Sequence, residues 1–312
     1  MIKNRSEFLF LYDVFYSNPN GDANDNIPRN DGEFILVSPQ RLKRTIRDYL
    51  LDYKGKEIFV RKEILDETKR TLKTREVLYS EYGSPNVLMQ RCIDIRLFGG
   101  TFALKSKSGS TSESTNFSLT GPVQFAFGKS LNRVNPEEIQ GTCVIPSTSD
   151  QDDDEKRQGT FTSRYVVPYA LIAFWGIANE NIVAKEQKPL GHTLTDDDIA
   201  LMIEAMWKGT RNLTSDSKVG QLPRFLLQII YKEGSDFHIG RLNSLISIQP
   251  ISDKSEEDIK DITDYVVDFS KLDNLINAHK EKILKIRYVE DILGQLNIVN
   301  ANFLANAEKI KF

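Results

Sequence analysis

Residues 8–16 have the sequence FLFLYDVFY, in which aromatic and branched side chains are dense enough to predict a buried central strand. The next residues, 17–33 (SNPNGDANDNIPRNDGE), are rich in Asn, Asp, Gly and Pro. Such residues satisfy their own backbone or accept a positive φ, so this stretch predicts a loop. Residues 34–37 (FILV) return to extended structure. A core strand followed by a long polar loop is therefore the first predicted unit.

A helix with two distinct faces is predicted from Ser38 to about Tyr53. Ser38 is a preferred N-cap residue, and Pro39 suits the first helical position. The apolar face follows helical spacing and should pack on the sheet, with members Leu42, Ile46, Tyr49 and Leu50. The opposite face is polar and cationic, with members Gln40, Lys43, Arg44 and Arg47.

The middle of the chain alternates charged, apolar and turn-rich stretches. Residues 54–90 look helical and heavily charged, and 105–118 are rich in Ser, Thr, Lys and Gly, which predicts a mobile loop. Residues 145–163, with an acidic run at 152–155, predict the tip of a long excursion between strands. Strands are predicted over 95–104, with an interruption at Gly99-Gly100, and over 121–128 and 164–176.

The last third contributes a second helix and a further strand. Thr195 should cap a helix whose apolar stripe includes Ile199, Met202 and Ile203. A strand is predicted over 222–231, an acidic segment over 252–268 and a final amphipathic helix over 270–290. The order strand, helix, strand, strand, helix, strand, with large insertions, predicts an α+β fold of ferredoxin-like or RRM-like type. We expect residues 1–312 to form a single elaborated domain.

Composition excludes several classes of protein. Two cysteines are too few for a disulfide framework, which favours a reducing compartment. The three histidines are scattered, without metal-ligand spacing, so no cofactor is expected. Charged residues break the first apolar stretch, so it does not resemble a signal peptide. The longest apolar run, residues 166–178, is too short to span a bilayer. We expect a soluble, cytoplasmic protein without a membrane partner.

Charge is distributed unevenly along the chain. The whole chain carries 41 Lys and Arg against 44 Asp and Glu, a net charge of −3, which argues against a general polyanion binder. Residues 40–107 alone carry 16 Lys and Arg against 9 Asp and Glu, a net charge of +7, so the remainder sums to −10. Charged residues on an outer helix face usually form only a solvated surface, but this segregation also fits a phosphate-binding surface within an acidic total.

Two motifs resemble known ligand sites without matching them. The loop from Asp22 to Glu33 places oxygen-bearing residues at the spacing of a calcium loop, but Ile27 occupies the position that requires glycine. A calcium-stabilised binding module without nucleic acid therefore stays a minor alternative. The segment 121–130 ends in Gly-Lys-Ser, but six residues separate its glycines where a Walker A motif has four. No linear RRM aromatic signature is present.

Five ordered segments carry a resemblance to a known family. They are YDVFYSNPNGDANDNIPR, LVSPQRLKRTIRDYL, IDIRLFGG, LTGPVQFAFGKSLNR and TFTSRYVVPYALIAFWG. In this order and spacing they resemble the backbone subunit of type I-B CRISPR Cascade, the Csh-two branch of the Cas-seven family. The resemblance covers roughly residues 5–232, and residues 252–312 match no motif of that family.

The resemblance implies an RRM-like palm with inserted fingers, approximately residues 54–94, and a thumb β-hairpin, residues 135–163. It implies a non-enzymatic subunit that binds CRISPR RNA (crRNA) and polymerises along it for antiviral defence. Target DNA would be recognised through guide pairing, while the protein contacts backbone and shape. Further copies of the chain and other Cascade subunits are the remaining implied partners.

The resemblance also implies which residues contact the guide. At the helix start, the resemblance implies that Ser38 and Gln40 form hydrogen bonds with the guide. It implies that Lys43, Arg44 and Arg47 contact guide phosphates. The helix N-terminus would add its free N–H groups. Loop residues also match the family's guide groove, although two of them, Asn18 and Asn20, equally suit a role in holding the loop. These loop residues and the weaker candidates that flank the thumb are Asn18, Asn20, Arg29, Arg133 and Arg164.

A metal-dependent endoribonuclease is the main alternative function. Backbone subunits of the related type III complexes cut target RNA with a loop aspartate. Asp22, Asp25 and Asp31 lie in a comparable acidic loop, where a metal ion could activate water. The type I branch leaves cutting to a separate nuclease-helicase, so the non-enzymatic interpretation is preferred.

Overall fold

The computed structural model describes residues 1–66, 68, 70–104, 115–143, 160–292 and 296–312. Its largest sheet has the strand order β16-β14-β11-β1-β10-β8-β2, with β7 and β9 also pairing to β10. The neighbouring strands from β14 to β2 are antiparallel, and β16 adds in parallel to β14. The bounds are β1 Ser6–Ser17, β2 Leu36–Val37, β7 Val123–Phe125, β8 Gly128–Ser130, β9 Glu137–Cys143, β10 Thr160–Ala178, β11 Gln221–Tyr231, β14 Ile283–Glu290 and β16 Glu308–Lys309.

Strand β1 lies at the centre of this sheet, as its sequence predicts. It pairs with β10 along one edge and with β11 along the other. Because successive side chains of a strand point to opposite faces, β1 contributes to two cores. Phe8 and Phe10 belong to one core, whereas Leu9 and Leu11 belong to the other. All four side chains are fully buried.

Helices α1 (Pro39–Asp52) and α7 (Asp196–Arg211) cover one face of the sheet. The predicted caps are confirmed, because Ser38 Oγ accepts from Arg41 N and Thr195 forms a full capping box with Asp198. The predicted apolar face of α1 is also confirmed, and its members Leu42, Ile46, Tyr49 and Leu50 are buried.

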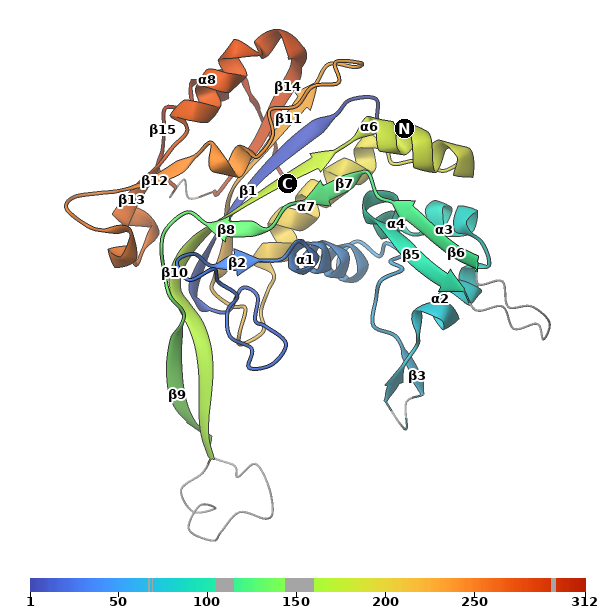
Figure 1. Ribbon diagram of the computed structural model, residues 1–312, viewed down its shortest axis with the longest axis horizontal. Helices are drawn as coiled ribbons and strands as arrows, with labels where there is room; N and C mark the ends of the chain where they lie inside the picture. Colours follow the sequence, from blue (N-terminus) through green and yellow to red (C-terminus); the bar gives the residue numbers. More distant parts are fainter. Residues whose placement is uncertain (67, 69, 105–114, 144–159, 293–295) are drawn as a thin grey trace.

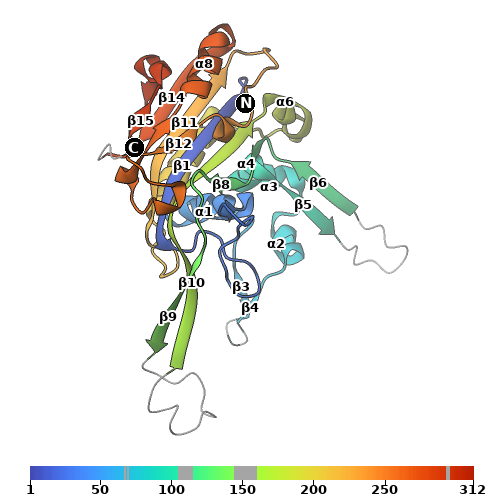
Figure 2. The ribbon, with the colours of Figure 1, turned by 60° about the vertical axis from the view of Figure 1, so that its left-hand side comes forward.

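The C-terminal third covers the opposite face of the sheet (Figure 2). It contains a small sheet of order β12-β13-β15, helix α8 and several short 3-10 turns. The bounds are β12 Ser247–Pro250, β13 Tyr265–Asp268, α8 Ser270–Ala278 and β15 Ile298–Val299. The acidic segment 252–268 thus belongs to a packed layer that buries this face of the sheet.

The predicted final helix over 270–290 is wrong in its second half. Helix α8 ends at Ala278, and residues Ile283–Glu290 form β14, which pairs antiparallel with β11. The sequence of β14, ILKIRYVE, contains branched and aromatic residues at a spacing that also suits a helix. The free edge of β11 decides between the two, because it supplies backbone partners.

The region between α1 and β7 forms a subdomain with its own core. The helical prediction for 54–90 holds for α2 (Arg75–Tyr82) and α3 (Pro85–Arg91), but it is wrong for the hairpin of β3 (Ile64–Asp66) and β4 (Thr71–Leu72). The predicted strand 95–104 is wrong at its start, because α4 (Ile93–Phe98) precedes β5 (Gly99–Leu104). Gly99 makes this change of structure possible, since its φ is +68° and an added Cβ would lie 2.1 Å from Leu119 O.

Two neighbouring predictions also need correction. The predicted loop 105–118 overlaps β6 (Thr115–Thr120), which pairs with β5, while 105–114 lie outside the described residues. The predicted strand 121–128 is divided into β7 and β8, which pair with different parts of β10. β10 can serve both because it is 19 residues long.

A long antiparallel arm, formed by β9 and the first part of β10, projects from the sheet (Figure 1). It confirms the strands that flank the predicted excursion, and the predicted strand 164–176 lies within β10. The predicted tip ends too late, because β10 already begins at Thr160. Residues 144–159 lie outside the described part of the chain. The β3–β4 hairpin projects on the other side, and α1 lies between the two projections.

Among the described residues, no helix is both long and apolar enough to cross a membrane.

Candidate nucleic-acid interface

The N-terminus of α1 and the loop after β1 form one hydrogen-bonded unit. Asn20 Oδ1 accepts from Ser38 N at 2.7 Å, and Asn20 O accepts from Arg29 N at 3.0 Å. The helix start and the loop are therefore held side by side. Three residues predicted from widely spaced positions, Asn20, Arg29 and Ser38, come together here.

Asn18 is a structural part of this loop. Its side chain is 2% exposed, and its Nδ2 donates to Asn26 O at 2.6 Å. Its backbone N donates to Ser217 O at 2.9 Å, while Lys218 Nζ donates to its carbonyl oxygen. Both asparagines therefore hold the loop in shape in this structure, which is one of the two roles weighed from the sequence.

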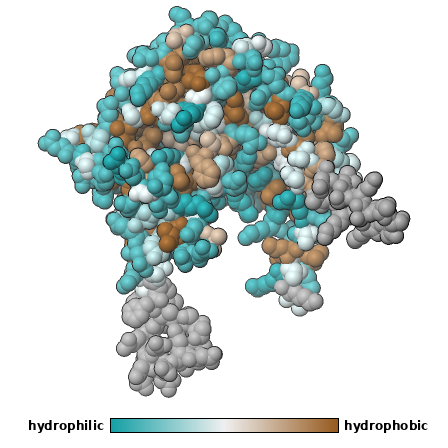
Figure 3. Space-filling view, viewed as in Figure 1, coloured by the Kyte–Doolittle hydropathy of each residue, from teal (hydrophilic) through white to brown (hydrophobic). Residues whose placement is uncertain are grey.

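Arg29 and Gln40 are the exposed members of the predicted set. Neither side chain has a hydrogen-bond or ion-pair partner among the residues that the structure describes. Arg29 lines a shallow pocket of about 360 Å³ together with Asp22, Asn30 and Phe127. Both side chains are therefore accessible at the surface. Between the two projections, Figure 3 shows a hollowed and mainly hydrophilic face.

The cationic stripe of α1 is largely occupied by partners within the chain. Arg44 Nε donates to Asp48 Oδ2 at 2.7 Å, a pair one helical turn apart. Lys43 Nζ donates to Gln124 Oε1 at 2.8 Å and lies 5.0 Å from the centre of the Phe98 ring. Burial, together with repulsion from Arg47, lowers the pKa of Lys43 to about 8.

Arg47 fastens α1 to the subdomain beside it. Its Nε donates to Asp94 Oδ2 at 2.9 Å, and the Asp94 side chain is fully buried. Asp94 also accepts from the backbone N of Phe59 at 2.8 Å and of Val60 at 3.1 Å. A buried carboxylate with three donors is well satisfied, so Arg47 has a structural role here.

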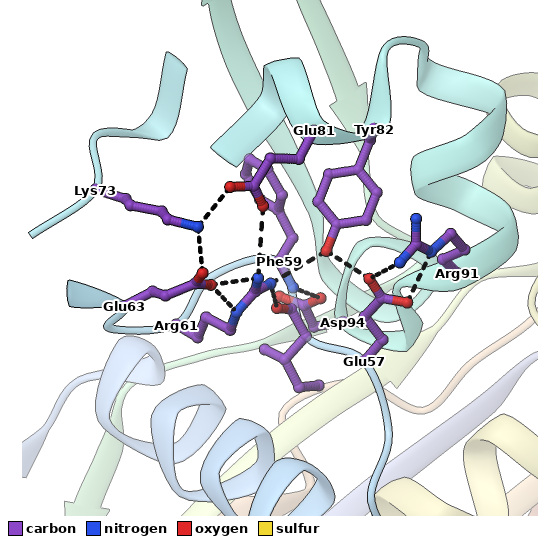
Figure 4. Close-up of polar contacts among 10 residues, drawn as sticks. Glu57, Phe59, Arg61, Glu63, Lys73, Glu81, Tyr82, Arg91 and Asp94 are labelled. Carbon is purple, nitrogen blue, oxygen red and sulfur yellow. Dashed lines mark hydrogen bonds and ion pairs between the residues drawn. The ribbon is translucent and has the colours of Figure 1, made fainter. Parts of the chain in front are cut away.

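The charges of this subdomain form a second, separate network, which Figure 4 shows. Arg61 and Lys73 both bind Glu63, and Lys73 also binds Glu81. Nearby, Glu57 accepts from Tyr82 Oη at 2.8 Å and from Arg91 Nε at 2.9 Å. Much of the positive excess of residues 40–107 is thus paired within the fold.

Two cations that sequence reasoning missed lie beside the start of α1. Arg41 follows Gln40 in the first turn of the helix, and Lys218 comes from the loop between α7 and β11. Both line one groove. A signal for Arg41 existed in its position within the first turn, whereas no linear pattern marks Lys218, which is brought close by the fold.

The two candidates that flank the projecting arm lie at its base. Arg133 N donates to Glu256 Oε2 at 3.3 Å, and its Nε lies 3.7 Å from Glu33 Oε2. Arg164 forms an ion pair with Asp216, close in sequence to Lys218. Both guanidinium groups are exposed and paired with carboxylates, apart from the helix start.

Two of the three loop aspartates proposed for the alternative function, Asp22 and Asp31, cap local turns. Asp22 Oδ1 accepts from the backbone N of Asp25 at 3.0 Å. Asp31 accepts from Phe34 N at 2.9 Å and pairs with Lys129 at 2.8 Å, which lowers the pKa of its carboxyl group. Within the described ranges, no group of three or more His, Cys, Asp or Glu residues is arranged to hold a metal ion.

Comparison with known proteins first defines the class of fold. Chains of two solved structures share it: a "CRISPR RNA-guided surveillance complex" (TM-score 0.51, 14% identity) and a "CRISPR RNA-guided surveillance complex, pre-nicking" (TM-score 0.52, 13% identity). The matches cover 99% of this chain and 95% and 96% of those chains.

Sequence comparison then defines the family. The family described as "CRISPR-associated protein Cas7" matches residues 4–270. A "CRISPR-associated protein Cas7" from Haloferax volcanii is 31% identical over 318 residues, covering 95% of this chain and 89% of that protein. The chain belongs to the Cas7 family.

Proposed function

We propose that this chain is the crRNA-binding backbone subunit of a type I CRISPR surveillance complex, Cascade. The observation that carries this proposal is the family match over residues 4–270, supported by the fold shared with chains of RNA-guided complexes. The five ordered motifs found in the sequence further support the type I-B subtype. Antiviral defence through guide-directed target recognition is the corresponding biological role.

The sheet supports an RRM-like palm. The strand order β11-β1-β10-β8, with α1 and α7 in the crossovers, is that of a split βαβ sandwich. In this proposal the subdomain around residues 54–94 is the fingers, and the arm around residues 135–163 is the thumb. Because the C-terminal layer buries one sheet face, the guide would lie on the α1 side, between the two projections.

The proposed guide contacts rest on the α1 start and the neighbouring loop. Exposed Gln40 and Arg29 are available for phosphate or ribose. The positive end of the helix dipole favours an anion here, although Ser38 N and Arg41 N are bonded within the chain and Pro39 has no N–H. Ser38 lies next to Gln40 at the same helix start. The proposed set also includes residues that each have an intramolecular partner: Lys43, Arg44, Arg47, Asn18, Asn20, Arg133 and Arg164.

The proposed partners follow from this role. Further copies of the chain would polymerise along crRNA, and other Cascade subunits would complete the complex. Target DNA would be bound through pairing with the guide. The role is structural rather than enzymatic and is exercised in the cytoplasm. Guide binding requires phosphate contacts and exposed amides.

RNA co-purification tests the proposal directly. The chain is expressed with the other Cascade subunits and a repeat-spacer transcript, and the absorbance ratio at 260 and 280 nm is measured before and after RNase. We expect a high ratio that falls on digestion. Assembly of the subunits at equal yield without RNA would contradict the proposal.

A cleavage assay separates the alternative function. Guide-matched RNA is incubated with the complex and divalent metal, alongside a variant that carries Asp31→Ala. We expect no cleavage by either protein. Cleavage by the unmodified complex that the substitution abolishes would establish the endoribonuclease instead.

A further inference from the structure

A groove of about 420 Å³ runs between α1 and the segment that follows α7. Its lining includes Arg41, Thr45, Tyr49, Asn212, Ser215 and Lys218. The groove adjoins the proposed guide contacts, because Arg41 directly follows Gln40 in the first turn of α1. It is otherwise separate from them, and its α7 side belongs to a loop that the sequence motifs do not include.

Two cations, Arg41 and Lys218, line this groove, and among the described residues no carboxylate is hydrogen-bonded or ion-paired to either. Arg41 is half-buried, and its guanidinium has no hydrogen-bond or ion-pair partner within the described part of the chain. Lys218 is also half-buried and donates to a neutral acceptor, Asn18 O. Burial lowers the pKa of Arg41, and burial plus repulsion from Arg41 lowers the pKa of Lys218 to about 8.

This arrangement costs stability in the free protein. Two like charges removed from water raise the free energy of the folded state unless an opposite charge compensates them. Arg44 and Arg47 avoid this cost through Asp48 and Asp94, whereas Lys43 donates to the neutral Gln124. An anion that enters the groove would remove this free-energy cost at Arg41 and Lys218.

The acidic groups of the groove compensate this pair only in part, because Asp48 attracts Arg41 without forming an ion pair with it. Asp48 and Asp52 line the groove, but Asp48 is held by Arg44 at 2.7 Å. Asp52 is the last residue of α1, about three turns from Arg41. Asn212 and Ser215 add uncharged polar groups to the wall. The Arg41 end of the groove is therefore the part suited to an anion.

We propose that Arg41 and Lys218 together bind one phosphate group of the single-stranded guide RNA. The inference rests on the proposed function and extends it to Arg41, which is not among the implied guide contacts, and to Lys218, which lies outside the family motifs. Guide RNA fits better than target DNA, because Arg41 continues the helix turn that carries Ser38 and Gln40. One strand can therefore contact both places.

The test is a salt titration of single-stranded guide RNA binding to the full chain. Arg41→Gln with Lys218→Gln should weaken binding about 10- to 100-fold, the range expected for lost charged hydrogen bonds. The slope of log K against log salt should become shallower by about 0.7–1.4, corresponding to one or two lost ionic contacts. Arg41→Lys with Lys218→Arg, which keeps both charges, should retain most of the affinity.

Lys271→Gln provides the matched control. Lys271 is an exposed cation on α8, on the opposite side of the sheet, so its loss should leave affinity and slope unchanged. The melting temperature of the double Gln variant should be equal to or above that of the unmodified chain, because a repulsive pair has been removed. A fall in melting temperature together with unchanged RNA affinity would show a purely structural pair and overturn the inference.

Two outcomes distinguish this inference from the proposed function. If the unmodified chain binds guide RNA and the double Gln variant binds it with the same affinity and slope, the groove assignment fails while the function stands. If the variant keeps its guide but loses only target DNA, the assignment to the guide fails.

Inorganic phosphate tests the groove without RNA. We expect phosphate to raise the melting temperature of the unmodified chain more than that of the double Gln variant. An equal shift in both proteins would overturn the site, whether or not RNA binds elsewhere.

Discussion

Arg41 and Arg47 lie on the same helix, yet the fold uses them in opposite ways. Arg47 donates to the fully buried carboxylate of Asp94 and fastens α1 to the neighbouring subdomain. Arg41 lines a groove with Lys218, and its guanidinium has no hydrogen-bond or ion-pair partner among the described residues. A positively charged helix face is therefore not one surface. Its cations divide into those that stabilise the fold and those available to a ligand.

The largest expected effect is on the Arg47 side of this comparison. Asp94→Ala removes the acceptor of two backbone N–H groups and leaves Arg47 without its carboxylate. We expect the free energy of unfolding to fall by about 3–5 kcal/mol, measured by denaturant titration. Asp52→Ala, an exposed carboxylate on the same helix, is the control and should change it by less than about 0.5 kcal/mol. An equal loss of unfolding free energy in both variants would contradict the structural role of the Arg47–Asp94 pair.

Reversing the charge at Arg41 should separate stability from binding. Arg41→Glu places a carboxylate beside Lys218, so the melting temperature should stay equal or rise. RNA binding should fall by roughly 100-fold, because a phosphate contact is replaced by repulsion. Filter binding and thermal melting on the same preparation check both results. Loss of folding in this variant would place Arg41 with Arg47 among the structural cations.

RNA affinity should depend on pH through Lys218. Its pKa is about 8 in the free chain, and a bound phosphate favours the charged form, so affinity is full below pH 8 and declines above it. Between pH 7 and 9 we expect a fall of up to about tenfold. The groups that face Lys218 across the groove are Arg41, Asp48, Tyr49, Asp52 and Tyr53, and burial raises the pKa of Tyr49 to about 12.

Two conservative variants isolate this pH effect. Lys218→Arg should flatten the profile, because arginine stays charged throughout this range. The control variant carries Lys43→Arg, because the pKa of Lys43 is also about 8. It reports any part of the pH dependence that arises from Lys43. A profile that only the Lys43 variant flattens would move the phosphate contact away from the groove.

The smallest expected effect belongs to Arg44. Its ion pair with Asp48 is half-exposed and one turn apart, so Arg44→Gln should lower the free energy of unfolding by about 0.3–0.5 kcal/mol. Denaturant titration at low and at high salt measures this value and its screening. A loss above about 2 kcal/mol would show that Arg44, like Arg47, supports the fold.

Local patterns were sufficient for several elements. The central strand β1, the Ser38 and Thr195 caps and the buried face of α1 all followed from residues adjacent in the chain. Other elements depended on partners elsewhere. The residues of β14 suit a helix or a strand, and the edge of β11 decides between them. Likewise, α4 turns into β5 at Gly99 because β6 approaches its backbone.

The sequence by itself determined which residues are polar, cationic and helical at the start of α1, because capping and periodicity act within a few residues. It also carries the motifs that resemble those of the family. The tertiary structure alone decided which cations are free. Asp94 is far from Arg47 in sequence, and Lys218 is farther still from Arg41, so neither pairing leaves a linear signal. Charge is a property of single residues, but its availability depends on neighbours that only folding brings together.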